Sequence, residues 1–325
     1  MFPVAEFINR SVLVGTSLVL GSTGEILTEK AGNLNLGIPG IMCSGAISGL
    51  VGGFLYLNSG AKFSSAVAIA ITLASCCLGS LIVTLIYSFL TITLRVNQNV
   101  TGLALTTFGV GLANFFGGSL KQLSGADSIS VVKIAKVYKK SLPFADKLGD
   151  FGKILFSYGF IVYLAIIIVL VVSFVLKKTR VGLHLCAVGE NPATADAAGI
   201  NVTRYKYLAT CIGGMISGLG GFYYFIDYMN GSWEDAAKIS QCGWLSIALV
   251  IFAVWRPVIS LFGSYVFGGL WILYNYTGFS VQIEPIINML PYVVTIIVLI
   301  TVSLRRKRET QPPASLGLNY FREDR

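Results

Sequence analysis

Charged residues are scarce in this chain, and acidic residues are the scarcer kind. Only 12% of its 325 residues are charged, with 24 Lys and Arg against 15 Asp and Glu, and His184 is the single histidine. Typical soluble domains carry about 25% charged residues, so this composition excludes an ordinary soluble domain. A proton or sodium relay inside a membrane normally needs buried acids or histidine, and the apolar stretches show almost none.

Three further signatures are missing. No GxxxxGKS or GxxxxGKT phosphate loop occurs, so the chain has no ATPase site of that type. No aromatic-interleaved basic groove is present, which excludes nucleic acid as a partner. The six cysteines lack metal-ligand spacing, which favours small core residues over disulfides or metal ligands. They are Cys43, Cys76, Cys77, Cys186, Cys211 and Cys242. We therefore expect no catalytic residue, no cofactor and no metal.

Long hydrophobic runs dominate what is present. The chain is 54% hydrophobic with a mean hydropathy of +0.75, and residues 154–176 form an uncharged run of 23 residues. At ~1.5 Å per residue, such a helix crosses a ~30 Å hydrocarbon core. Similar runs lie near residues 11–27, 34–57, 65–94, 99–120, 205–228, 242–255, 258–277 and 286–304. The sequence predicts an all-α, polytopic transmembrane helical bundle of about eight to ten spans, some of them broken or re-entrant.

Basic clusters orient this bundle in the membrane. The tightest ones lie directly against membrane ends, where the positive-inside rule acts most strongly, so we place them in the cytoplasm. They are Lys177 with Lys178 and Arg180, Arg204 with Lys206, and the run 305–308. The predicted organisation is a single transmembrane domain, residues 1–304, followed by a basic cytoplasmic tail, 305–325. Within the domain, residues 177–204 form a cytoplasmic loop, and residues 121–153, with seven lysines, form an extracellular loop.

Small residues and one interruption mark several spans. Residues 43–56 and 211–224 are rich in Gly, Ser and Ala, which allows close helix packing. They also resemble each other, so internal duplication and convergence on small-residue packing are both open. In residues 31–42, Pro39 and three glycines loosen a helix, and a broken helix at membrane depth must be buried or line a cavity. This segment is a candidate pathway lining or, alternatively, a kinked packing helix.

The amides at the start of another span point to a polar solute. Asn97 and Gln98 precede a long apolar run. Because amides both donate and accept hydrogen bonds, they suit an uncharged polar solute better than an ion. Asn99 has a second interpretation as the cap of the helix that follows.

The stretch GENPATADAAGINV, residues 189–202, reads as a small capped helix. Asn191 is a good N-cap, Pro192 suits the first helical position and Gly199 suits the position after the last turn, which predicts a helix over 192–198. So short a helix is marginal in water and must dock against something. It has few large apolar residues with which to pack against the rest of its own chain, so binding to a separate soluble partner would supply the missing contact. An ordinary structured loop is the alternative.

Several runs resemble one family. Residues 179–209 resemble the cytoplasmic loop of permease subunits of ABC importers that handle branched-chain amino acids, sugars and nucleosides. The runs 24–42, 96–105, 243–257 and 290–299 are similar to other signatures of that family. The pattern is most like the nucleoside-type permeases that pair with a basic-membrane-protein-like lipoprotein.

The resemblance implies a complete importer around this chain. It implies a separate ABC ATPase subunit, a second permease that is identical or homologous, an extracellular solute-binding lipoprotein, and a multi-pass place in a bacterial-type plasma membrane with a cytoplasmic C-terminus. The residues implied to couple to the ATPase are Glu190, Asn191, Pro192, Ala195, Asp196 and Gly199. The residues expected to line the substrate pathway are Asn33, Asn35, Pro39, Asn97, Gln98, Phe108 and Trp244; core packing is the alternative for the two aromatic residues.

Two positions depart from the family pattern. Pro39 stands where the relatives usually have Glu, which removes a carboxylate beside the expected pathway and weakens the inference of a nucleoside. Cys186 stands where they usually have Arg, and His184 two residues earlier is a partial substitute or a plain surface residue.

The alternatives belong to other classes. A sugar or a branched-chain amino acid is the alternative solute, an ion-coupled secondary transporter is the alternative mechanism, and a membrane scaffold without transport is a third class. In the outer loop, Lys133, Lys136, Lys139 and Lys140 are candidates for docking an acidic binding protein; solvation or contact with lipid headgroups explains them equally well.

Overall fold

Nine apolar helices form the body of the part of the chain that the structure describes. The computed structural model describes residues 4–60, 62–124, 129–140, 155–277, 281–305 and 311–321. Within them, six helices are long and apolar enough to cross a membrane: α1 (Val4–Lys30), α2 (Ile38–Leu57), α3 (Ser65–Ser88), α4 (Gln98–Ser124), α7 (Phe160–Lys178) and α10 (Val202–Tyr223). Three shorter ones are α11 (Ala237–Phe252), α12 (Pro257–Ile272) and α15 (Leu290–Arg305). Every predicted hydrophobic run falls on one of these helices, and the all-α class is confirmed.

Short elements connect the long helices. Single π-helical turns extend α3 and α10, as η1 (Phe89–Thr93) and η3 (Tyr224–Tyr228). The other short elements are α5 (Val132–Tyr138), α8 (Arg180–Glu190), α9 (Pro192–Ala197), α13 (Tyr274–Thr277), η4 (Val281–Ile283) and α14 (Glu284–Asn288). Two dipeptide strands, β1 (Ile129–Ser130) and β2 (Ser232–Trp233), pair antiparallel with Ile129 opposite Trp233. This pairing joins the predicted outer loop to the segment after α10.

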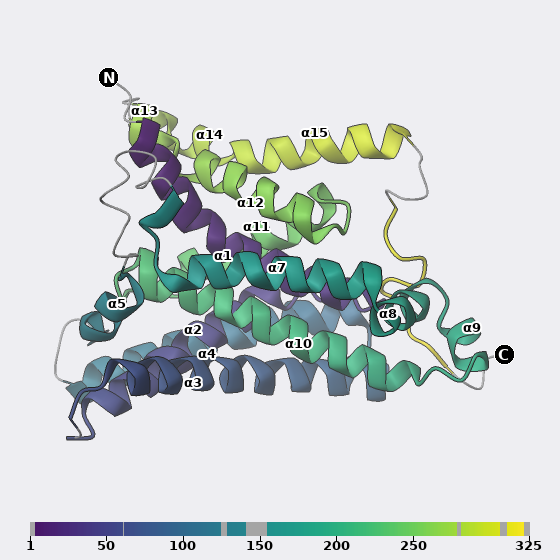
Figure 1. The fold of residues 1–325 in the computed structure, drawn as a ribbon, viewed down its shortest axis with the longest axis horizontal. Helices are drawn as coiled ribbons and strands as arrows, with labels where there is room; N and C mark the ends of the chain where they lie inside the picture. Colours follow the sequence, from purple (N-terminus) through teal and green to yellow (C-terminus); the bar gives the residue numbers. More distant parts are fainter. Residues whose placement is uncertain are drawn as a thin grey trace.

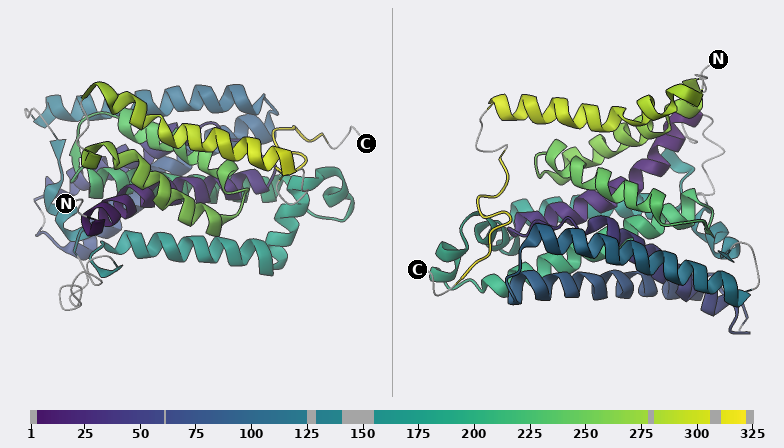
Figure 2. Two further views of the ribbon diagram at one scale, coloured as in Figure 1. Left: turned by 90° about the horizontal axis from the view of Figure 1, so that it is seen from above. Right: turned by 180° about the vertical axis from the view of Figure 1, so that it is seen from behind.

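The long helices lie along one common direction, so the molecule has two ends. Figure 1 shows α8, α9 and the C-terminal segment at one end, and α5, α13 and the N-terminus at the other. Figure 2 shows the same separation from two further sides. We call these ends the α9 end and the α5 end.

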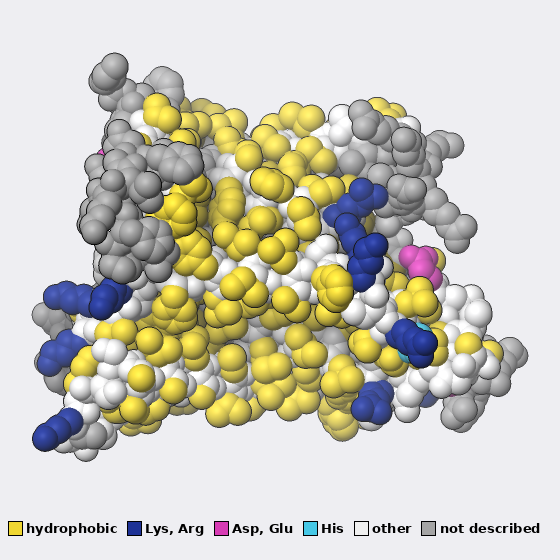
Figure 3. All heavy atoms as spheres, in the orientation of Figure 1, with side chains coloured by type: hydrophobic (Ala, Val, Ile, Leu, Met, Phe, Trp, Pro, Cys, Tyr) yellow, Lys and Arg dark blue, Asp and Glu magenta, His cyan; other side chains and the backbone are white. Residues whose placement is uncertain are grey.

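The outer surface is that of a membrane protein. Hydrophobic side chains cover the middle of the face in Figure 3, and basic side chains gather towards its two ends. On α7, Ile167, Leu170 and Phe174 are each more than half exposed. Because water would disfavour such a continuous apolar belt, its natural surroundings are lipid acyl chains.

Small residues let the central helices approach closely. A methyl group at Gly45 of α2 would lie 2.6 Å from the carbonyl oxygen of Gly218 of α10. The two small-residue stretches noted in the sequence therefore face each other, as expected for packing driven by backbone contact. All six cysteines are free, and three of them, Cys43, Cys76 and Cys242, are buried.

The close approach of α2 and α10 makes a testable prediction. We expect Gly45→Ala to destabilise the purified protein by about 1–3 kcal/mol, because the added methyl overpacks the contact. Gly111→Ala on α4 is the matched control, since a Cβ there meets nothing within 4 Å, and helix propensity alone favours alanine. Chemical unfolding in detergent measures both, and equal stability of the two variants would contradict the packing.

Candidate functional site

The capped helix predicted from the sequence is α9. The Asn191 side chain accepts a hydrogen bond from the Thr194 amide at 3.0 Å, and Pro192 opens the helix. Gly199 has a φ of +83°, and the next residue, Ile200, donates its amide to the Ala195 carbonyl at 3.0 Å. The start and stop signals are confirmed, and the helix ends at Ala197, one residue earlier than predicted.

This chain itself supplies part of the surface against which α9 packs. Ala195 is buried in a small cluster with Val188 of α8 and Val202 of α10, against which Tyr320 also packs. The expectation that the chain offers little to hold this helix was therefore wrong, because residues distant in sequence supply the apolar contact. The opposite face of α9 is exposed and made of small residues. They are Ala193, Thr194, Ala197 and Ala198.

The neighbouring helices hold α9 at a defined place. Thr179 caps α8 by accepting from the Gly182 amide, and Asn201 caps α10 by accepting from the Arg204 amide. His184 does not lie in a loop: it is on α8, and its Nδ1 is 2.9 Å from the hydroxyl of Tyr205 on α10. These contacts tie the two helices flanking α9 to each other.

Cys186, the departure from the family pattern, also lies on α8. It is partly buried, and this burial raises the pKa of its thiol above the ordinary value, while nearby Lys30 acts in the opposite direction. A thiol with a raised pKa is protonated at neutral pH and chemically unreactive. Cys186 lines a cavity of about 280 Å³ beside Lys30 and Trp255.

The C-terminal segment crosses the α9 end of the bundle. The Ser315 amide donates to the Gly189 carbonyl at 3.0 Å, and the Tyr320 hydroxyl donates to an Asp196 carboxylate oxygen of α9 at 2.9 Å. Figure 1 shows this segment running from beyond α15 to α9. Of the predicted tail, residues 311–321 are thus packed on the bundle, and residues 306–310 lie outside the described part of the chain. The apolar residues of this stretch, among them Leu316 and Tyr320, were the signal in the sequence.

Three of the predicted pathway residues hold the connection between α1 and α2. The Asn33 amide donates to the Thr210 hydroxyl at 2.8 Å, and the Gln98 side chain accepts from the Leu34 amide at 2.7 Å. The backbone amide of Asn35 donates to Glu25 at 3.1 Å. Residues 31–37 therefore form a buried link between two helices, and the expected break inside one spanning helix does not occur.

The other four predicted pathway residues lie apart. Asn97 caps α4 by accepting from the Val100 amide, so the cap is this residue and not Asn99. Pro39 is buried at the start of α2. Phe108 and Trp244 are 49% and 37% exposed. None of the cavities described in this structure is lined by any of the seven residues, and their role in a pathway stays a prediction.

Two buried carboxyl groups were missed by the sequence reasoning. Glu25 and Glu29 on α1 are 0% and 2% exposed. Glu29 accepts a hydrogen bond from the indole nitrogen of Trp255, and Glu25 accepts the one from Asn35. An acid at the end of an apolar run gives no sign of its burial until the elements around it are placed.

An aromatic pocket lies at the α5 end. Its volume is about 480 Å³, and it is lined by Tyr224, Tyr228, Lys238, Gln241, Trp271, Tyr274, Asn275 and Tyr292. The rings of Tyr224 and Tyr228 stack with centroids 4.9 Å apart. A concave site with aromatic faces and a few amides binds flat or sugar-like solutes well. None of these residues had been singled out from the sequence, because they come from η3, α11, α12, α13 and α15.

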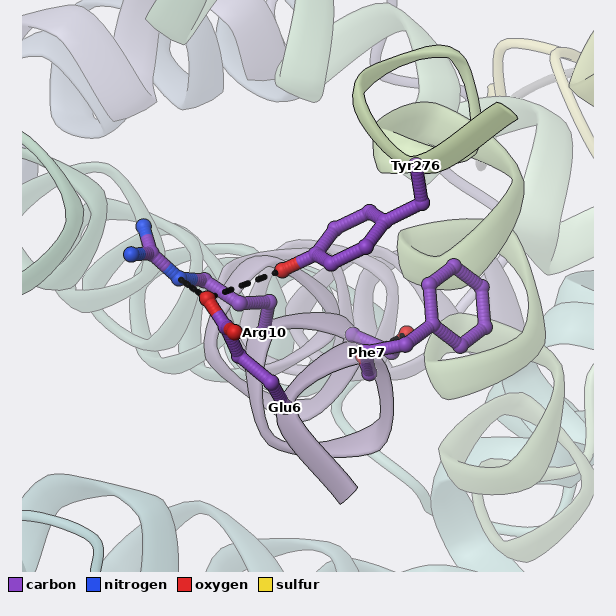
Figure 4. Close-up of polar contacts among 5 residues, drawn as sticks. Glu6, Phe7, Arg10 and Tyr276 are labelled. Carbon is purple, nitrogen blue, oxygen red and sulfur yellow. Dashed lines mark hydrogen bonds and ion pairs between the residues drawn. The ribbon is translucent and has the colours of Figure 1, made fainter. Parts of the chain in front are cut away.

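The first turns of α1 border this pocket. A second cavity of about 290 Å³ shares Tyr228 and Asn275 with it and is also lined by Glu6 and Arg10. In Figure 4 the Tyr276 hydroxyl points to the Glu6 carboxylate, 3.4 Å away, and Arg10 reaches the same carboxylate from the next turn of α1. The start of α1 is thereby fixed to α13 beside the aromatic pocket.

Comparisons with known proteins agree on one family. Residues 7–302 match the family model described as "Branched-chain amino acid transport system / permease component". The chain is 32% identical to a protein of Haloferax volcanii provisionally named a glucose ABC transporter permease protein, TsgC13, over 98% of each chain. It is 30% identical to the nucleoside ABC transporter permease protein NupC of Lactococcus lactis, over 96% of this chain and 95% of that one. It is 28% identical to the guanosine ABC transporter permease protein NupQ of Bacillus subtilis, over 89% of each.

The hydrogen bond between Tyr320 and α9 can be tested without an activity assay. A hydrogen bond contributes about 0.5–1.5 kcal/mol, so Tyr320→Phe should speed hydrogen exchange at the amides of α9 about 2- to 10-fold. Tyr56→Phe is the control, because its hydroxyl bonds near the end of α2, at Lys62 and Ser64. Unchanged exchange in α9 of the Tyr320 variant would show that the C-terminal segment does not steady this helix.

Proposed function

Because the chain belongs to the family of permease components of branched-chain amino acid transport systems, we propose that it is the membrane-spanning subunit of an ATP-driven nucleoside importer. The coarser part, an ABC permease for a small polar solute, follows from the family and from relatives that match almost the whole chain. The nucleoside, the partners and the roles of single residues form the rest of the proposal.

One observation carries the proposed mechanism: a single continuous helix joins the two candidate sites. α10 begins beside α9, and its last turns, as η3, place Tyr224 and Tyr228 in the aromatic pocket. The 27 residues from Val202 to Tyr228 correspond to about 40 Å at ~1.5 Å per residue. A force on α9 therefore reaches the solute pocket through one rigid element.

The exposed face of α9 suits an ATPase subunit. It is a shallow surface of small side chains between two spans, with Glu190 and Asn191 exposed beside it. The chain has no phosphate loop of its own, so ATP is hydrolysed on the partner. Closure of the ATPase pushes on α9, and the contacts of Asp196 and Ala195 transmit the movement to the C-terminal segment and to α10. Gly199 allows the sharp turn that separates α9 from α10.

The aromatic pocket suits a nucleoside. Tyr228, stacked on the buried Tyr224, and Trp271 offer faces to a flat base. The amides of Gln241 and Asn275 offer donors and acceptors to its edge or to the ribose. The relatives named for nucleosides and guanosine support this choice. A sugar is the second candidate, since sugar faces also pack on aromatic rings and one relative is named for glucose.

The proposed ATPase contact also implies an orientation of the protein in the membrane and the positions of the remaining partners. With the ATPase on α9, the α9 end and the C-terminus are cytoplasmic, and the α5 end faces the outside of a plasma membrane. On α5, Lys133 and Lys136 are exposed, as is Lys140 just beyond it, whereas Lys139 contacts Asn230 and Asp227. The exposed lysines offer an acidic binding lipoprotein a docking point. A second permease, identical or homologous, completes the membrane part.

The solute assignment is tested by uptake. Cells with and without the system take up labelled guanosine, ribose and leucine in parallel, and we expect guanosine uptake to depend on this chain. Stacking on an aromatic ring contributes about 1–3 kcal/mol per base, so Tyr228→Ala or Trp271→Ala should lower guanosine uptake at least 5-fold. Phe174→Ala, on the lipid-facing side of α7, is the control and should not change it. Uptake of ribose or leucine alone would sink the nucleoside assignment.

The ATPase contact is tested by co-purification. Ala197→Trp adds bulk to the exposed face of α9 and should abolish co-purification of the ATPase subunit while the permease still folds. The matched control is Ala66→Trp, an exposed alanine in the first turn of α3 at the other end of the molecule. Transport that continues without any ATPase subunit would instead favour the secondary transporter.

A further inference from the structure

A further cavity, at the α9 end, has no part in the mechanism above. Its volume is about 770 Å³, and it lies between the end of α3, the start of α10 and the C-terminal segment. We call it the basic pocket. Its lining includes Arg95, Arg204 and Lys206 together with the hydroxyl-bearing side chains of Thr91, Thr203 and Tyr207.

Among the residues that the structure describes, positive charge exceeds negative charge in this pocket. Three cationic side chains line it against one carboxylate, that of Asp196, which accepts the hydrogen bond from Tyr320. The guanidinium of Arg95 lies over the ring of Phe321, 4.6 Å from its centroid, which fixes that cation at the mouth.

Lys206 is the buried cation that lines this pocket. It is only 3% exposed and lines the pocket, yet its ammonium forms neither a hydrogen bond nor an ion pair with any residue that the structure describes. The lysines that make ion pairs, Lys139 and Lys238, are far more accessible. Burying an unpaired ammonium is costly. A structure that keeps one at the wall of a cavity is suited to an anion inside it.

The backbone adds to this preference. The first turn of α10, from Asn201 to Arg204, forms part of the wall. This 22-residue helix presents the positive end of its dipole there. Helix start, buried ammonium and guanidinium groups thus converge on one space, which is the arrangement that recognises phosphate.

The rim of the pocket is apolar on the side of the bundle. Leu208 lines it and is 48% exposed, and Leu94, next to Arg95, is 54% exposed. We propose that the basic pocket binds a phosphate group, with Lys206 as its central contact. The apolar rim favours the phosphate of an anionic lipid headgroup whose chains lie along α3 and α10, and free phosphate satisfies the same chemistry.

A bound phosphate would steady the α9 end. It would contact the start of α10 and the C-terminal segment at Asn319 and Tyr320 together, and these are the elements that hold α9. Anionic lipid would then strengthen the link between α9 and the bundle whatever solute the protein carries.

The test uses the purified full chain in detergent. Native mass spectrometry measures binding of phosphatidylglycerol and, in parallel, of phosphatidylcholine with the same acyl chains; thermal shift measures binding of inorganic phosphate. Lys206→Met keeps an unbranched side chain only one atom shorter and removes its charge. We expect phosphatidylglycerol to bind the wild type and the variant to lose about 10-fold or more in affinity, as for a charged hydrogen bond. Lys62→Met, at an exposed lysine between α2 and α3 at the opposite end, is the matched control and should bind as the wild type does.

Arg95→Gln provides a second variant, from a different element, in case Lys206→Met fails to fold. Binding of inorganic phosphate that depends on Lys206, without binding of phosphatidylglycerol, supports the site with free phosphate as its ligand. Equal anion binding by wild type, Lys206→Met and Arg95→Gln overturns the proposal, and so does the absence of anion binding by the wild type. The proposal is also overturned if Lys206→Met no longer co-purifies with the ATPase subunit but binds anions as the wild type does. An acidic residue of that subunit would then be the partner of Lys206.

Discussion

Polar groups inside a membrane protein must find partners within the protein, and this constraint shapes the bundle around α1. Ser17 of α1 donates to the Gly220 carbonyl of α10, and Ser22 bonds Ser260 of α12. Glu29 bonds Trp255, which follows α11. Because lipid offers no alternative partner, these bonds fix which helix lies against which face of α1. Close packing at small residues such as Gly45 then fills the remaining space.

The two ends of the molecule are connected through this bundle. α10 is bonded to α1, packed on α2 through glycine, and shared by the α9 contact and the aromatic pocket. The proposed importer mechanism needs such an element, because a partner at one end must change the exposure of a solute at the other. An ion-coupled mechanism has less support: Glu25 and Glu29 are buried acids, but their bonds to Asn35 and Trp255 serve the link between α1 and its neighbours.

The C-terminal segment anchors the α9 end to the rest of the bundle. A loop helix held only by its flanking spans would move independently of the rest of the bundle. Here Ser315 and Tyr320 join it to a segment that also touches the α1–α2 connection, where the Gly317 amide donates to Gly32. The basic pocket lies against the same segment, so the proposed ATPase contact and the proposed phosphate site share one set of supports.

The sequence by itself determined the features that depend on neighbouring residues. Uncharged runs predicted the helices, Asn191 and Gly199 predicted the limits of α9 to within one residue, and resemblance over most of the chain gave the family, because caps, periodicity and motifs are local. Tertiary structure decided the rest. Tyr224, Trp271 and Tyr292 meet in one pocket from three separate elements, and Lys206 is left buried beside a cavity only once α3 and the C-terminal segment surround it. In a chain this apolar, aromatic and small residues occur on nearly every helix, so which of them face one another depends on helix packing that no local pattern records.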